Sequence, residues 1–125
     1  MPVVEGLKRM IDRQLEQGKK EEQLKKKEVE ELFSERSRVH LQVHGKVQGV
    51  FFRHFVKQTA DSLELTGWAR NTSEGTVEIM AEGDKGKLRE LIVKCKKGPA
   101  IAQVDNVDYE WGEFTGKFNN FYIKY

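Results

Sequence analysis

The segment from residue 38 to residue 63 constrains the fold most strongly, because its pattern changes from that of a strand to that of a helix. Hydrophobic and polar residues alternate over residues 39–44, which is typical of a strand with one buried face. Gly45 and Gly49 then interrupt the alternation. The hydrophobic residues that follow share one face of a helix, namely Phe52, Phe55, Val56, Ala60 and Leu63. The segment therefore predicts a strand, a glycine-containing loop and a helix in succession.

The rest of the chain extends this order. Residues 67–71 and 76–82 predict two strands joined by a short turn. A second amphipathic helix follows, which ends at Gly98 and Pro99 and whose hydrophobic face consists of Leu88, Leu91, Ile92 and Cys95. Two later segments predict strands, the first with alternating Val107, Tyr109 and Trp111, the second within residues 118–125. The order βαββαβ, with room for an extra strand, predicts an α+β, ferredoxin-like sandwich with two helices on one face of an antiparallel sheet.

The composition of the chain changes near Ser37. Residues 1–37 are densely charged, and their few hydrophobic residues recur at helical spacing. We expect a charged helical or mobile N-terminal extension over residues 1–37 and one folded domain over residues 38–125. Two interpretations of the extension stay open. It is either a solvated helix, which is marginally stable alone, or a helix that docks on another protein, a second copy or the domain itself.

Charge and cysteine content exclude several classes of protein. Lys and Arg total 22 against 20 Asp and Glu, a net charge of +2 that argues against a nucleic-acid binder built on a basic surface. The single cysteine, Cys95, cannot form an intramolecular disulfide. The apolar runs are too short for a membrane span, and the first residues do not resemble a signal peptide. We therefore expect a cytoplasmic protein with neither a nucleic-acid nor a membrane partner.

The loop between the first predicted strand and helix is suited to binding an anion. Its glycines allow successive N–H groups to point into one concavity, and the helix N-terminus adds partial positive charge. Arg53 lies in the first helical turn, where a cation is unfavourable unless an anion is bound; otherwise its side chain extends into solvent. Asn71 ends a strand before a turn, a position that asparagine also occupies for local backbone reasons.

Two segments resemble the signatures of the acylphosphatase family. Residues 43–53 read VHGKVQGVFFR and residues 67–83 read GWARNTSEGTVEIMAEG, in the order and spacing of that family. The resemblance covers residues 38–125. It implies a ferredoxin-like fold that hydrolyses a small-molecule acyl phosphate to a carboxylate and inorganic phosphate, without a metal ion, a cofactor or a phosphoenzyme.

The resemblance also implies roles for individual residues. Arg53 would bind the phosphate, and Asn71 would orient the attacking water through its amide oxygen, since an amide cannot serve as a base. The phosphate cradle would consist of Gly45, Lys46, Val47, Gln48, Gly49 and Val50. Thr72 and Thr76 would support Asn71 and the adjoining turn.

Other functions are less consistent with the sequence. The histidines His40, His44 and His54 have no further ligand at a spacing typical of a metal site, so we expect no bound metal. Domains of this order also bind single-stranded RNA through aromatic residues on the central strands. Here the open face of the first and third strands is expected to carry His40, Gln42, His44, Glu78, Met80 and Glu82, without a stacking ring.

Two further alternatives keep the fold. The first is the acylphosphatase-like domain at the front of large carbamoyl-transfer maturation proteins, which are much longer chains. The second is an interaction module that acts through residues 1–37 and has a vestigial pocket. Cys95, Trp68 and Trp111 are expected to be packing residues.

Overall fold

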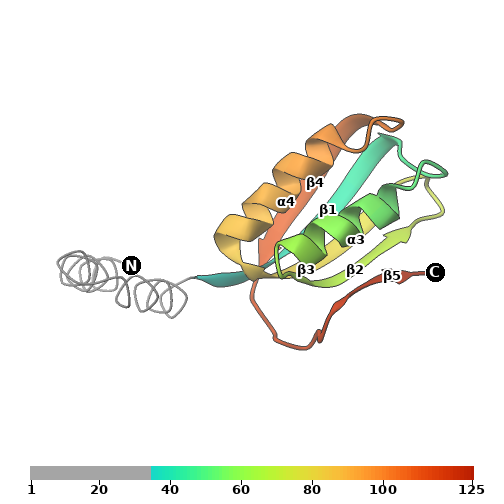
Figure 1. The fold of residues 1–125 in the computed structure, drawn as a ribbon. Coiled ribbons are helices and arrows are strands. Elements are labelled where there is room, and N and C mark those ends of the chain that lie inside the picture. Colours follow the sequence, from blue (N-terminus) through green and yellow to red (C-terminus); the bar gives the residue numbers. More distant parts are fainter. Residues whose placement is uncertain (1–34) are drawn as a thin grey trace, which may run out of the picture. The chain divides into compact units, whose positions relative to one another are not determined.

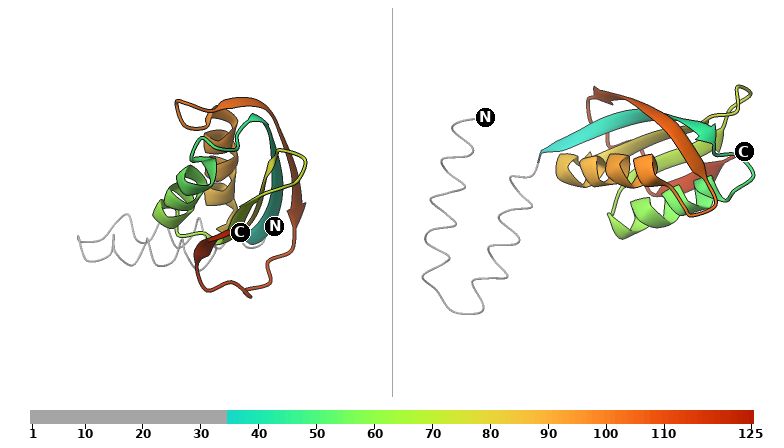
Figure 2. Two further views of the ribbon diagram at one scale, coloured as in Figure 1. Left: turned by 90° about the vertical axis from the view of Figure 1, so that its right-hand side faces the viewer. Right: turned by 90° about the horizontal axis from the view of Figure 1, so that it is seen from above.

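The computed structural model of the protein describes residues 35–125, so residues 1–34 of the helical extension predicted over residues 1–37 lie outside the described residues. The described elements, in chain order, are β1 (Arg36–Lys46), α3 (Phe52–Ser62), β2 (Thr66–Asn71), β3 (Val77–Asp84), α4 (Lys85–Lys97), β4 (Gln103–Gly112) and β5 (Phe121–Lys124). The five strands form one sheet in the order β4-β1-β3-β2-β5, and α3 and α4 lie on the same face of it (Figures 1 and 2). The predicted succession of strands and helices is confirmed, and β1 begins earlier than the predicted Arg38.

The sheet is mixed, because its last strand runs parallel to its neighbour. β1 pairs antiparallel with both β3 and β4, and β2 pairs antiparallel with β3. β5 pairs parallel with β2, so the prediction of a wholly antiparallel sheet is wrong at this edge. The connection from β4 crosses to the far edge of the sheet before β5 begins, and this crossing sets the direction of β5 (Figure 1).

The core lies between the sheet and the two helices. The alternating hydrophobic residues of β1 and β3 face the helices and are fully buried, namely Val39, Leu41 and Val43 with Val77, Ile79 and Ala81. The helices contribute the residues that their periodicity predicts, including Phe52, Val56 and Ala60 from α3 and Leu88, Leu91 and Cys95 from α4. Cys95 is fully buried, which confirms that it is a packing residue, and this burial raises the pKa of its thiol to about 12.

The two helices begin in different ways. Asp84 caps α4 by accepting a hydrogen bond from the Lys87 backbone N–H at 3.1 Å. The cap of α3 is Phe51, which has a positive φ of 62° and whose side chain provides no cap hydrogen bond. Helix α3 therefore presents its N-terminal N–H groups without the side-chain acceptor that usually satisfies one of them.

Glu82 departs from its predicted environment. Its place in β3 puts it on the face opposite the helices, as predicted, yet its side chain is 0% exposed because the β4–β5 connection covers it. The carboxylate accepts hydrogen bonds from Thr115 N at 3.2 Å, Thr115 Oγ1 at 2.8 Å and Gly116 N at 3.0 Å, and from Arg38 Nε at 2.9 Å. Burial by itself raises the pKa of Glu82, but these hydrogen bonds and the Arg38 charge outweigh it and lower the pKa.

Candidate active site

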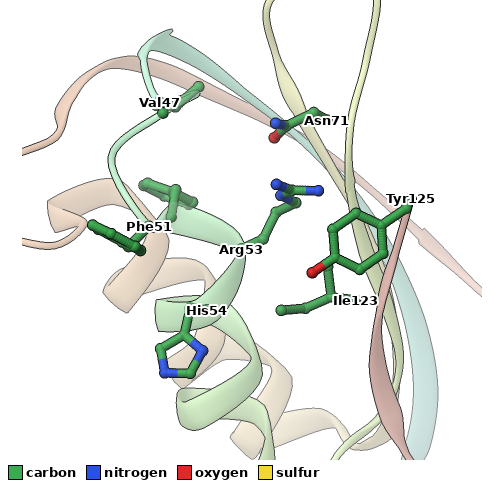
Figure 3. A pocket seen from close by; sticks show the side chains of 9 residues that line it. Val47, Phe51, Arg53, His54, Asn71, Ile123 and Tyr125 are labelled. Atoms are coloured by element: carbon green, nitrogen blue, oxygen red, sulfur yellow. The ribbon is translucent and has the colours of Figure 1, made fainter.

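A pocket of about 580 Å³ opens at the end of the sheet where β1 leads into α3. Three parts of the chain line it, which are the loop and first turn of α3, the end of β2, and the C-terminal residues from β5 onward (Figure 3). The lining residues are Val47, Gly49, Phe51, Phe52, Arg53, His54, Asn71, Ile123 and Tyr125. Residues far apart in the sequence therefore meet at one cavity.

Arg53 and Asn71, the two catalytic residues predicted from the sequence, both lie in this pocket. The Arg53 guanidinium points toward the Asn71 amide (Figure 3). Both residues are partly buried, and within residues 35–125 neither side chain has a hydrogen-bond or ion-pair partner. Arg53 Cζ lies 4.9 Å from the centroid of the Tyr125 ring, a cation–π distance. The two polar groups are thus free to bind a ligand.

Positive charge is concentrated at this end of α3. The first N–H groups of a helix lack acceptors within the helix, and the N-terminus has a partial positive charge. Here no side chain caps the N-terminus of α3, and Arg53 adds a full charge within the first turn. Such an arrangement favours a bound anion, and a guanidinium can donate two parallel hydrogen bonds to phosphate oxygens.

The predicted phosphate cradle is divided between the pocket and its surroundings. Val47 and Gly49 line the cavity, whereas Val50 packs into the core. Gly45 and Lys46 lie in β1, outside the lining, and pair with β4 at a register shift. Gly45 has a φ of +128°, and a Cβ there would lie 2.1 Å from the Gln103 carbonyl oxygen, so the irregular pairing requires glycine.

Gly49 differs from Gly45 in its surroundings. Its φ is +74°, and a Cβ added there would meet no atom within 4 Å. Because Gly49 also lines the cavity, the positive φ turns the backbone beside open space that a ligand can occupy.

Gln48, Thr72 and Thr76 are absent from the pocket lining and are joined to one another by hydrogen bonds. The Gln48 amide nitrogen donates to the carbonyl oxygens of Thr72 at 2.8 Å and Thr76 at 2.9 Å. The two threonine hydroxyls lie 2.6 Å apart, and Thr76 Oγ1 donates to Gln42 Oε1 at 2.8 Å. These residues therefore connect the loop to the turn after Asn71.

Five pocket residues are missing from the sites predicted from the sequence, namely Phe51, Phe52, His54, Ile123 and Tyr125. Phe51, 77% exposed, stands at the rim with its positive φ, and Ile123 and Tyr125 come from the C-terminal end (Figure 3). Phe52 is a core residue that also reaches the cavity. In the sequence, only the position of Phe51 directly after the glycine loop indicated that it could border the site. Nothing in the sequence pattern places β5 beside β2.

The histidines do not converge. His54 borders the pocket, but its ring points away from Arg53 and Asn71 (Figure 3). On the open face of the sheet, His40 Nε2 lies 2.7 Å from a Glu78 oxygen, and His44 Nε2 lies 3.0 Å from an Asp108 oxygen. Within the described residues, no three His, Cys, Asp or Glu side chains are grouped as a metal site would require.

Glu78 on this open face is held ionised by its neighbours. Partial burial by itself raises its pKa, but hydrogen bonds from His40 and Arg70 outweigh that effect and lower it. Glu78 thus belongs to a surface ion-pair network on the face opposite α3, away from the pocket.

No helix among residues 35–125 is long and apolar enough to cross a membrane.

Comparison with known proteins identifies close relatives of this domain. The acylphosphatase family model matches residues 39–123. An acylphosphatase from Pelotomaculum thermopropionicum is 46% identical over 90 residues, which are 72% of this chain and 98% of the relative. One from Caldanaerobacter subterraneus is 47% identical over 85 residues, which are 68% of this chain and 94% of the relative. The crystal structure of acylphosphatase from Bacillus subtilis superposes with a TM-score of 0.69 at 34% identity, covering 71% of this chain and 99% of that one.

Proposed function

The chain belongs to the acylphosphatase family and hydrolyses the carboxyl–phosphate bond of acyl phosphates, and we propose that it does so in the pocket that contains Arg53 and Asn71. The observation that carries this assignment is the Arg53 guanidinium, which has no anionic partner in residues 35–125 and stands at an uncapped helix N-terminus. A cation placed there without a ligand is electrostatically unfavourable, whereas a bound phosphate compensates it.

Arg53 and the backbone N–H groups of the loop and first helical turn bind the phosphate in this proposal. Their donors act on the non-bridging oxygens, where negative charge has to be stabilised during phosphoryl transfer. Because these groups are positioned by the fold before substrate arrives, little reorganisation accompanies the reaction.

Asn71 orients the attacking water. Its amide oxygen accepts a hydrogen bond from water and holds the molecule in line with the bond to be broken, and a phosphate oxygen of the substrate takes the proton. The leaving group is a carboxylate, which departs without protonation by a general acid. We therefore propose that positioning and charge stabilisation are sufficient and that the reaction requires no metal ion.

The substrate is a small-molecule acyl phosphate, and residues 1–34 are not needed to hydrolyse it. A truncation should start at Glu35 and not after Ser37, because Ser37 Oγ donates to the Gly112 carbonyl at 3.1 Å within the sheet. We propose that residues 1–34, which are most of the extension predicted over residues 1–37, serve a protein partner or self-association. The single cysteine is a buried free thiol, in keeping with a reducing cytoplasmic location.

The test is phosphate release from benzoyl phosphate, with and without a chelator. We expect activity that chelation leaves unchanged; strong inhibition by the chelator would contradict the metal-free mechanism. Arg53→Ala should weaken the binding of both substrate and inorganic phosphate, whereas Asn71→Ala should lower turnover and retain phosphate affinity. Loss of phosphate binding in Asn71→Ala with normal turnover of bound substrate would show that the two roles are wrongly assigned.

A further inference from the structure

The side-chain amide of Gln48 donates both of its protons to the turn between β2 and β3. The amide nitrogen donates to Thr72 O at 2.8 Å and to Thr76 O at 2.9 Å, which are two carbonyl groups at either end of the same turn. The side chain is therefore directed toward the β2–β3 turn, although Gly49, the next residue, lines the pocket. A neutral amide with both donors engaged has no N–H left for a phosphate oxygen.

The turn to which Gln48 is hydrogen-bonded begins immediately after Asn71. Thr72 N donates to Thr76 O at 2.9 Å, and Gly75 N donates to Thr72 O at 3.3 Å, so the turn is a closed unit. Gln48 adds a further donor to each of these two carbonyl oxygens. A shift of Thr72 carries Asn71 with it, because the two residues share a peptide bond.

We propose that Gln48 is a positioning residue, which fixes Asn71 relative to the phosphate-binding loop and acts on turnover through Asn71. The inference rests on the role proposed above for Asn71. Gln48 connects the phosphate-binding loop to the turn that follows Asn71. The distance between these two parts has to be kept, because Arg53 and the loop bind the phosphate while Asn71 binds the water that attacks the phosphorus atom. An error of about 1 Å in such an alignment can cost about 10²-fold in rate.

A different role for Gln48 is conceivable from its place in the chain. Because it precedes Gly49, its substitution could distort the loop and weaken phosphate binding directly. The two roles differ in the quantity they change. A defect in water placement lowers kcat, whereas a defect in the loop raises KM and the inhibition constant of phosphate.

The experiment is a double-mutant cycle between Gln48→Met and Asn71→Ala, with benzoyl phosphate as substrate and inorganic phosphate as competitive inhibitor. Methionine keeps the length and approximate volume of glutamine but has no donor. We expect Gln48→Met to lower kcat by about 10- to 100-fold in the wild-type background. The KM and the inhibition constant of phosphate should change by less than about twofold. In the Asn71→Ala background, Gln48→Met should change kcat by less than about twofold, because its effect is transmitted through Asn71.

The matched control is Gln58→Met on the exposed side of α3, which should leave every constant unchanged. Equal losses of kcat from Gln48→Met in both backgrounds would overturn the proposal, as would a rise in the inhibition constant of phosphate that accounts for the loss. Wild-type turnover in Asn71→Ala alone would contradict the role of Asn71 and, with it, that of Gln48. If Gln48→Met does not fold, as judged by circular dichroism, Gln48→Asn enters the same cycle with the same outcomes, because it retracts the amide by one methylene.

Discussion

Arg53 and Glu82 are charged residues at opposite ends of the β2–β3 pair, and the protein surrounds them in opposite ways. Arg53 lies in the pocket beside Asn71, which pairs with Val77 at the start of β3, and within residues 35–125 its side chain forms no hydrogen bond or ion pair. Glu82 lies near the other end of β3 and is 0% exposed. Its carboxylate accepts hydrogen bonds from Thr115, Gly116 and Arg38.

The difference separates a structural charge from a functional one. A buried charge has to be paired and hydrogen-bonded, and Glu82 meets this requirement with partners from its own chain. Arg53 is left with donors that nothing in the described chain accepts, in a concave site next to a helix N-terminus. In the function proposed above, the substrate supplies its missing partner, and bound phosphate compensates the cost of keeping Arg53 unpaired.

The largest effect is expected on the functional side of the comparison. Arg53→Ala should lower kcat/KM for benzoyl phosphate by roughly 10³-fold, because a charged donor to the transferring phosphoryl group is lost. Its free energy of unfolding should stay within about 0.5 kcal/mol of wild type, since no described hydrogen bond or ion pair is broken. The control is Arg89→Ala on α4, which also removes an arginine from above an aromatic ring, because Arg89 Cζ lies 5.9 Å from the centroid of the Trp111 ring in β4. A large loss of stability in Arg53→Ala would contradict the distinction.

The opposite result is expected for Glu82→Ala. It should lower the free energy of unfolding, measured by urea denaturation, by roughly 3 kcal/mol, because it leaves Arg38 and the N–H groups of Thr115 and Gly116 without their buried acceptor. Turnover by the folded fraction should stay near wild type. Glu110→Ala, on the same face of the sheet but exposed, should have little effect on either quantity. Unchanged stability of Glu82→Ala would show that the hydrogen bonds around it contribute nothing net.

A smaller effect is expected from protonating Glu82 without replacing it. Burial alone raises its pKa, but the hydrogen bonds from Thr115 and Gly116 and the Arg38 charge lower it below the ordinary value of 4.5. The unfolded chain therefore takes up a proton more readily than the native protein in this range. The stability contributed by the ionised carboxylate is complete above pH 4.5 and is lost as the pH falls through the native pKa. Wild type and Glu82→Gln, compared by urea denaturation, should converge in stability as the pH is lowered; a gap that widens instead would contradict this sign.

The smallest effect concerns the ring that contacts Arg53. Tyr125 is 97% exposed, and its ring centroid lies 4.9 Å from Arg53 Cζ. Tyr125→Leu should weaken phosphate binding by only about two- to fivefold, since cation–π contacts at exposed sites are weak. Tyr122→Leu, another exposed tyrosine near the C-terminus, is the control and should leave the inhibition constant of phosphate unchanged. A loss comparable to that of Arg53→Ala would mean that Arg53 depends on Tyr125 for its position.

Sequence patterns predict the parts of this fold whose signals are local. The alternation of β1 and the hydrophobic faces of α3 and α4 lie within single segments, and each predicts its element and its buried side. The burial of Glu82 depends on Thr115, which lies 33 residues further along the chain, so strand alternation places Glu82 on the open face without revealing its cover. The parallel direction of β5 depends in the same way on the path of residues 113–120, which have no regular period.

The site likewise contains residues that the sequence predicts and features that it does not predict. Arg53 and Asn71 follow from the loop and from the resemblance of two motifs, and both line the pocket. The positive φ of Phe51 is unfavourable for a bulky residue, so residue preferences argue against it. The direction of the Gln48 side chain could not be predicted either, because its acceptors are backbone carbonyls, which any residue type provides.

Cys95 gives this protein an intrinsic chemical reporter. It is the one cysteine in the 125-residue sequence, its side chain is fully buried in α4, and burial raises the pKa of its thiol to about 12. Thiol reagents attack the thiolate, so at neutral pH the native protein offers them almost no nucleophile. Alkylation of Cys95 therefore requires α4 to separate from the sheet. If α4 recloses faster than the reagent reacts, the alkylation rate measures the free energy of that opening. Local unfolding of α4 can thus be followed in the unmodified protein by the rate of a chemical reaction.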